Sequence, residues 1–247
     1  MDVVFLDSDY KDQFNAEDLQ AEISPGDAED HLDHPKKTIF VISGLSGSGK
    51  GTLLEKVGEK LPITISRSYT TRKRRGGERE DAYFFTDETT FHEMEKGGKF
   101  LETNYYARHY YGTPLSELDR LLSIDNVIRV IEIDVNGYQN LLHYDYGYDL
   151  VSVFILPPSV DDLVKRLHDR GTESLPSMIR RLRHAIIEVQ SIDDYDHVII
   201  NDDENAAVRE LKDILGQTGS THPRKSIDKA LWIKTLKQAV RDLGEQV

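Results

Sequence analysis

Apolar runs and amphipathic stretches alternate along most of the chain, and this alternation is its main structural signal. Short apolar runs predict strands at 38–43, 63–66, 83–85, 127–133, 151–156 and 197–200. Between them, apolar residues recur at helical spacing, which predicts helices over 51–61, 87–97, 114–122, 136–142, 159–169, 175–191 and 204–215. The runs at 127–133 and 151–156 are mostly apolar, as in strands covered on both faces. The pattern predicts an α/β fold of three layers, with a parallel sheet flanked by helices.

Both ends of the chain fall outside this alternation. Residues 1–35 hold eleven acidic side chains against the single Lys11, a balance of −10 within a formal net charge of −13. This composition indicates an acidic N-terminal extension that is mostly loop. Residues 218–247 begin with a turn-rich linker and continue as an amphipathic helix. The apolar positions of that helix are Ile227, Leu231, Ala239, Val240 and Leu243. We expect this short face to pack on the domain; a membrane or a partner protein is the alternative.

The composition excludes several kinds of chemistry. The chain has no cysteine, which rules out disulfides, thiolate metal sites and cysteine nucleophiles and fits a reducing compartment. No apolar run approaches the roughly 20 residues of a membrane-spanning helix, and the first residues lack the basic region of a signal peptide. We therefore expect a cytoplasmic protein that does not bind membranes. The net negative charge also argues against a nucleic-acid polymer as partner.

The most informative motif is a glycine-rich loop behind the first predicted strand. Residues 44–52 read Gly-Leu-Ser-Gly-Ser-Gly-Lys-Gly-Thr, between the apolar run 38–42 and a helical pattern. In this arrangement backbone N–H groups and the helix N-terminus bind phosphate, and Lys50 reaches the outer phosphates. A flexible Gly/Ser turn is the alternative, which the flanking strand and helix disfavour. The predicted ligands of a nucleoside triphosphate are Gly44, Ser46, Gly47, Ser48, Gly49, Lys50, Gly51 and Thr52.

The residue after the lysine departs from the usual form of this motif. A hydroxyl that binds Mg²⁺ normally follows the lysine, but here Gly51 stands in that place and the hydroxyl comes one residue later, at Thr52. We expect Mg²⁺ to accompany the nucleoside triphosphate and to be held mostly by phosphate oxygens and water. Thr52 is then a weak metal ligand that acts through water.

A second set of motifs concerns the other substrate. Residues 68–78, Ser-Tyr-Thr-Thr-Arg-Lys-Arg-Arg-Gly-Gly-Glu, form the most basic stretch of the chain. Alone, such a stretch is typical of a solvated loop or a nucleic-acid patch. Here it is followed by Tyr-Phe-Phe at 83–85, Phe-Leu-Glu at 100–102 and Tyr-Tyr-Gly-Thr at 110–113. In this order, the four segments resemble the acceptor-binding motifs of guanylate kinases.

The resemblance extends over roughly residues 37–216. Further matching segments are Glu-Ile-Asp-Val-Asn-Gly at 132–137, Leu-Pro-Pro-Ser at 156–159, Lys-Arg-Leu at 165–167 with Arg-Gly-Thr at 170–172, and Ile-Ile-Asn-Asp-Asp at 199–203. The resemblance implies a P-loop kinase fold over 36–217, with an inserted GMP-binding subdomain at about 67–118 and a mobile lid at about 166–190. It also implies ATP-dependent phosphoryl transfer to GMP or dGMP in a closed two-substrate site.

Roles on the acceptor side follow from this resemblance. Glu102 is expected to accept hydrogen bonds from N1 and the 2-amino group of guanine, and hydroxyls of Ser68 and Thr113 complete that edge. A site that pairs these groups rejects adenine, because unpaired buried polar groups are costly. Asp134 either contacts the guanine site, orients the waters of Mg²⁺ or caps a strand end. The residues that match the acceptor-phosphate ligands are Arg72, Arg75, Tyr83 and Tyr111.

Roles on the donor side follow in the same way. Arg166, Arg170 and Arg181 match the arginines of the mobile lid, which with Lys50 would spread the charge of the transferring phosphoryl group. Asn201 and Asp202 match the loop that holds the donor adenine. The sequence leaves two other functions open: a related P-loop kinase whose acceptor is a phosphorylated sugar, and a non-catalytic phosphoprotein-binding scaffold of this fold. Glu102 argues against the first, and the intact Lys50 argues against the second.

Overall fold

The computed structural model describes most of the chain beyond the acidic segment. The described residues are 37–76, 78–106, 108–142, 148–169, 174–216 and 225–245. The predicted extension 1–35 and one predicted site residue, Arg170, lie outside them. All features described below belong to one compact unit, Lys36–Val247.

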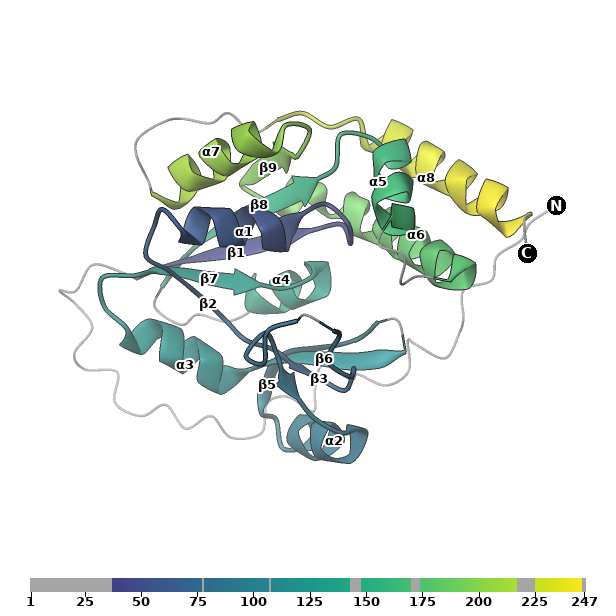
Figure 1. Cartoon of the computed structure of the whole chain (residues 1–247). Coiled ribbons are helices and arrows are strands. Elements are labelled where there is room, and N and C mark those ends of the chain that lie inside the picture. Colours follow the sequence, from purple (N-terminus) through teal and green to yellow (C-terminus); the bar gives the residue numbers. More distant parts are fainter. Residues whose placement is uncertain are drawn as a thin grey trace. The chain divides into compact units, whose positions relative to one another are not determined.

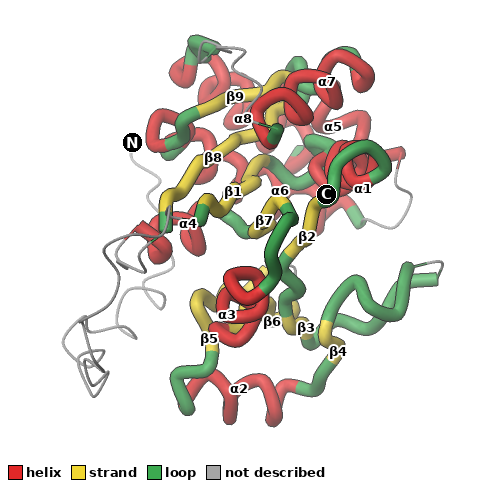
Figure 2. Tube along the Cα trace, turned by 90° about the vertical axis from the view of Figure 1, so that its left-hand side faces the viewer, coloured by secondary structure: helices red, strands yellow, loops and turns green. Residues whose placement is uncertain are grey.

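A five-stranded sheet in the order β2-β7-β1-β8-β9 forms the centre of this unit, and its neighbouring strands pair in parallel. The strands are β1 (Thr38–Gly44), β2 (Ile63–Ile65), β7 (Ile128–Glu132), β8 (Asp149–Leu156) and β9 (His197–Ile200). Alternate residues of β1 serve opposite faces. Phe40 and Ile42 pack with α1 (Lys50–Gly58) and α7 (Glu204–Leu215), whereas Ile39 and Val41 belong to the core of the other face. The sheet therefore lies between two helix layers (Figures 1 and 2), and the predicted α/β fold is confirmed.

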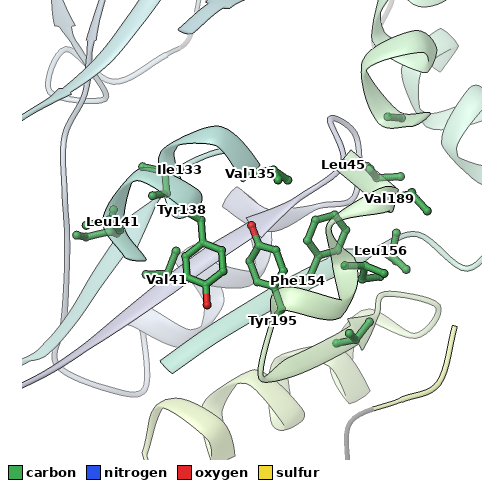
Figure 3. Close-up of a cluster of buried hydrophobic side chains, with 14 of the residues drawn as sticks. Val41, Leu45, Ile133, Val135, Tyr138, Leu141, Phe154, Leu156, Val189 and Tyr195 are labelled. Atoms are coloured by element: carbon green, nitrogen blue, oxygen red, sulfur yellow. The ribbon is translucent and has the colours of Figure 1, made fainter. Parts of the chain in front are cut away.

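The larger core lies on the face covered by α4 (Val135–Leu142), α5 (Val160–Asp169) and α6 (Leu175–Gln190). Tyr138 of α4 packs against Tyr195 with ring centroids 4.5 Å apart, and Tyr195 meets Phe154 of β8 edge-on at 5.0 Å (Figure 3). The Tyr138 hydroxyl donates to Ser152 Oγ at 3.0 Å, so this buried phenol has a partner. These contacts fix the junction of β7 and α4, where Asp134 lies.

A second sheet is inserted between β2 and β7 in the chain, with the order β4-β3-β6-β5. Its elements are β3 (Tyr69–Thr70), β4 (Phe84–Phe85), β5 (Phe100–Tyr106) and β6 (His109–Pro114), followed by α3 (Leu115–Ser123), with α2 (Glu88–Lys96) between β4 and β5. Stacked rings join α2 to this sheet, since Phe91 lies 4.7 Å from Phe100 between centroids. The sequence pattern predicts the strand at 83–85 but not β3, β5 or β6, where aromatic residues are mixed with polar ones.

Helix α8 (Lys229–Gly244) packs on α6 and α5. Leu236 is fully buried in the larger core, although the sequence analysis did not place it on the apolar face. Leu231 is the opposite case: it is 57% exposed because it lies off the stripe that faces the domain. That stripe comprises Trp232, Ile233, Leu236, Ala239, Val240 and Leu243. Among the described residues, no helix combines the length and the apolar character needed to span a membrane.

Candidate active site

The glycine-rich loop leaves the carboxyl end of β1 and runs into α1. Gly49 has φ of 94°, in the left-handed region, and precedes α1 without a side-chain cap. Gly44 is needed for close packing, because a Cβ there would lie 2.2 Å from the carbonyl oxygen of Ile155. Lys50 Nζ donates to Gly44 O at 2.6 Å and so lies along the loop. The lysine and the uncapped N-terminus of α1 line one cavity, which favours an anion.

Three predicted residues meet at the donor end of this loop. Arg166 on α5 donates from Nη2 to Asn201 O at 2.8 Å and from Nη1 to Ser48 O at 3.2 Å. Asn201 Nδ2 donates to the same Ser48 carbonyl at 2.8 Å. The Ser48 side chain is buried, so this residue contributes its carbonyl to the arrangement. The cavity here is lined by Gly47, Gly49, Thr52, Arg166, Asn201, Asp202 and Glu204.

Glu102 lies opposite Thr113 in the antiparallel pair of β5 and β6. Thr113 donates to Glu102 Oε1 from its backbone N at 3.0 Å and from Oγ1 at 2.7 Å. Ser68 Oγ lies 3.0 Å from Thr113 Oγ1, and Ser68 is the donor there because the threonine proton is already engaged. No described residue donates to Glu102 Oε2, and the side chain lines a cavity. The three predicted guanine-edge residues therefore form one connected chain of hydrogen bonds.

Two carboxyl groups in this cavity have raised pKa values. Burial raises the pKa of Glu102 to about 7, the charge of nearby Asp134 adds to the shift, and the Thr113 hydrogen bonds oppose it. Burial also raises the pKa of Asp134, against the hydrogen bonds from Gly137 N, at 2.9 Å, and from Asn104. Only glycine fits at position 137 without a shift of its neighbours, since a Cβ there would lie 2.8 Å from Glu102 Cγ. Asp134 thus belongs to the same pocket as Glu102.

The basic stretch places Arg72 in the adjoining cavity. Its side chain is 9% exposed, and the guanidinium donates two hydrogen bonds to Glu78, from Nη2 to Oε1 at 2.6 Å and from Nη1 to Oε2 at 2.9 Å. Glu78 Oε2 also accepts from Arg75 N at 2.9 Å, so one carboxylate holds both predicted phosphate ligands. The Arg72 guanidinium carbon lies 5.3 Å from the centre of the Tyr83 ring, and burial raises the pKa of Tyr83 to about 12. Tyr83 therefore enters this site as a neutral hydroxyl.

Helix α6 brings side chains to the cleft from the far side. Arg181 is 7% exposed and hydrogen-bonds Ser46 of the glycine-rich loop through Nη1. His184 and Glu188 follow at helical spacing and line the cavity that contains Glu102. His184 Nδ1 lies 3.6 Å from Glu188 Oε1. Glu188 and Asp134 raise the pKa of His184, although burial, the largest single influence, acts to lower it.

These cavities form one continuous cleft. The residues shared by the cavity of Glu102 and the cavity of Arg72 are Ser46, Lys50, Tyr83, Tyr111 and Glu132. The residues shared by the cavity of Arg72 and the cavity of Asn201 are Gly47, Gly49 and Thr52. The cleft therefore runs from Glu102, past Arg72 and Lys50, to Asn201.

Sequence reasoning missed five polar residues of this cleft. Glu78, Asn104, Glu132, His184 and Glu188 all line it or hold a side chain that does. Two had a usable signal: Glu132 ends the same strand that leads to Asp134, and His184 follows Arg181 by three positions on one helix. Asn104 had none, because only the pairing of β5 with β6 shows which way it faces.

Known proteins resemble the chain over this whole region. A family model described as guanylate kinase matches residues 36–218. The guanylate kinase of Mycoplasmoides gallisepticum is 39% identical over 180 residues, which are 72% of this chain and 91% of that protein. The guanylate kinase of Chromohalobacter salexigens is 35% identical over 211 residues, covering 84% and 96%. The crystal structure of guanylate kinase from Anaplasma phagocytophilum superposes with a TM-score of 0.56 at 26% identity, covering 83% of this chain and 95% of that one.

Proposed function

The chain belongs to the guanylate kinase family, and from this premise we propose that the cleft transfers a phosphoryl group from ATP to GMP or dGMP, giving ADP and the guanosine diphosphate. One observation carries the proposal most directly. Glu102, a buried carboxylate with one oxygen free of hydrogen bonds from described residues, lines the same cavity as Lys50 of the glycine-rich loop. A carboxylate that can accept hydrogen bonds from guanine and a loop that can bind phosphate therefore line one cleft.

The acceptor base binds at the Glu102 end. Ionised Glu102 accepts from guanine N1 and the 2-amino group, since both are donors and a carboxylate is an acceptor only. Ser68 can turn its proton from Thr113 toward guanine O6, because the two hydroxyls are only 3.0 Å apart. Asp134, which accepts hydrogen bonds from Asn104 and Gly137, adds negative potential near the N1–H and 2-amino groups of the base. Adenine presents the opposite pattern on this edge and leaves these groups unpaired.

The acceptor phosphate binds between the basic loop and Lys50. Arg72 and Arg75 supply positive charge there, and Tyr83 and Tyr111 offer hydroxyl groups. Glu78 keeps Arg72 in place before the substrate arrives, so less side-chain entropy is lost on binding.

The donor triphosphate lies on the glycine-rich loop with its adenine toward Asn201 and Asp202. Lys50, Arg166 and Arg181 surround the loop from α1, α5 and α6, and they stabilise the charge that spreads over the transferring group. Arg170 is proposed to join them, although it lies outside the described residues. The acceptor phosphate oxygen attacks in line, and no protein side chain forms a covalent intermediate, because positioning and electrostatics suffice for this transfer.

The donor set beside the loop fits Mg²⁺ bound together with ATP. Thr52 offers a hydroxyl and Glu132 a carboxylate, and both line the cavity that also contains Lys50. Mg²⁺ prefers such oxygen donors and keeps most of its waters and phosphate ligands. When bound, the ion would neutralise charge on the phosphate oxygens of ATP.

The proposal predicts a clear acceptor preference. A coupled assay of ADP release should show turnover with GMP and dGMP and little with AMP, CMP, UMP or a phosphorylated sugar. If ADP release does not depend on GMP, the proposed reaction is wrong. Activity on the sugar phosphate alone would instead favour the related kinase reading.

Acceptor binding is expected to weaken as the pH falls through 7. The pKa of Glu102 is raised to about 7 in the free protein, so below that pH the carboxyl carries a proton and loses one acceptor position. The KM for GMP should rise about tenfold between pH 8 and pH 6, since each pH unit below the pKa lowers the ionised fraction about tenfold. The KM for ATP should change little.

The acceptor phosphate itself titrates near pH 6, so the profile needs a control. The variant Glu102→Gln cannot titrate at this position, and its profile should lack the inflection near pH 7. An inflection that persists in the variant would assign the effect to the substrate.

A further inference from the structure

Helix α8 is an addition to the part of the chain that the family model covers. That part ends at residue 218, and α8 spans Lys229–Gly244. The helix is nevertheless built into the domain: Figure 1 shows it, in yellow, alongside α6 and α5. Its main partner is α6, and its second helix partner is α5. These are the helices that carry Arg181 and Arg166 into the cleft.

Helix α6 carries two rows of side chains with different surroundings. One stripe carries Arg181, His184 and Glu188, which reach Ser46 and the acceptor cavity. A neighbouring stripe is apolar and buried in the larger core together with Leu236 of α8. Its members are Met178, Leu182, Ala185 and Val189. Because packed interiors shift only in discrete steps, a change in the apolar stripe is transmitted to the polar one.

A polar contact anchors the start of α8 to the end of α6. Lys229 forms an ion pair with Asp193, just beyond α6, and its Nζ lies 3.4 Å from the carbonyl oxygen of Gln190, the last residue of α6. A cation beside these terminal carbonyls also complements the negative end of the helix dipole. The first turn of α8 thus holds the end of α6, and Leu236 lies in the same core as the apolar stripe of α6.

We propose that α8 is a positioning element of the transfer site, which holds α6 so that Arg181, His184 and Glu188 meet the cleft in register. The inference rests on the proposed function, in which positioning supplies most of the rate. No residue of α8 lines the three described cavities of the cleft, so its influence passes through α6. A small misplacement of catalytic groups is sufficient for a large kinetic effect.

The test compares two buried leucines in the full-length chain. Leu236→Ala removes the core contact of α8, and Leu215→Ala, at the end of α7, is the matched control in the other core. Both residues are at most 2% exposed, so both variants should melt at a lower temperature than the wild type. At a temperature where both are folded, Leu236→Ala should lower kcat about tenfold or more and raise the KM for GMP. Leu215→Ala should keep both constants within about twofold of wild type.

Two further measurements distinguish a shift of α6 from a general loss of stability. Leu236→Met, which conserves volume, should restore kcat, and amide hydrogen exchange should rise in residues 175–190 of Leu236→Ala but not of Leu215→Ala. If Leu236→Ala does not fold, Lys229→Ala gives the answer, because it loosens only the first turn and should lower kcat by a smaller factor. Wild-type kcat in folded Leu236→Ala or, if that variant does not fold, in Lys229→Ala would overturn the inference. Absence of GMP turnover in the wild type would instead overturn the proposed function.

Discussion

Replacing Glu102 with glutamine is expected to lower kcat/KM for GMP by two to three orders of magnitude at pH 8, where the wild-type carboxylate is ionised. Two hydrogen bonds from guanine to a charged acceptor are at stake, and such bonds contribute about 1.5–3 kcal/mol each. The glutamine NH₂ group would also face a guanine donor, which leaves both groups without an acceptor. Steady-state kinetics with varied GMP at saturating ATP measure the loss.

Stability separates this effect from misfolding. The folded pKa of Glu102, about 7, lies above the ordinary value of 4.5, so ionising the group destabilises the folded protein as the pH rises from 4.5 through 7. Glutamine does not ionise, and the melting temperature of the variant at pH 8 should therefore be no lower than that of the wild type. Glu93→Gln, an exposed carboxylate on α2 of the same subdomain, is the matched control and should leave kcat/KM unchanged. An active Glu102→Gln enzyme would mean that guanine is read elsewhere.

The sequence predicts those parts of the site that are local in the chain. The loop from Gly44 to Thr52 is recognisable because strand, glycines, lysine and helix are contiguous, and in the structure the loop and the start of α1 line the cavity of Arg72. The central strands are recognisable for a related reason, since burial on both faces leaves a mostly apolar run such as 151–156, in which Ser152 is the one polar residue.

Pairing between distant segments is what the sequence could not supply. Strands β5 and β6 carry Glu102 and Thr113 on facing positions, but their mixed aromatic and polar residues give no clear alternation. Asn104 and His184 are 80 positions apart and line the same cavity, which only the packing of α6 across the cleft reveals. The hydrogen bonds from Arg72 to Glu78 likewise depend on the path of the basic loop, which the sequence does not show.

Arg166 and Arg181, the two described lid arginines, show the same limit of prediction from sequence. The sequence groups Arg166 and Arg181 by resemblance, whereas the structure gives them different neighbours. Arg166 binds the carbonyls of Ser48 and Asn201 at the donor end, and Arg181 binds the Ser46 side chain at the other end of the loop. We therefore expect both arginines to stabilise the transferring group from different positions, Arg166 from beside Asn201 and Arg181 from beside Ser46.

Replacing Lys50 with alanine is expected to lower kcat about 100- to 1,000-fold, the usual effect of removing one charged donor from a transferring group. Lys50 Nζ lies 2.6 Å from Gly44 O, and the side chain lines both the cavity of Glu102 and the cavity of Arg72, so it borders both proposed substrate sites. Single-turnover kinetics at saturating ATP and GMP measure the chemical step separately from product release.

The lysine should act on the transition state more than on ATP binding. The loop N–H groups and the uncapped N-terminus of α1 remain in Lys50→Ala and continue to bind the triphosphate, so the Kd of ATP should rise only modestly. Lys60→Ala, an exposed lysine just beyond the end of α1, removes the same charge from the same region and should keep wild-type kcat. Equal losses of kcat and ATP affinity in Lys50→Ala would place the lysine in ground-state binding instead, and unchanged kcat would leave the charge of the transferring group to Arg166 and Arg181.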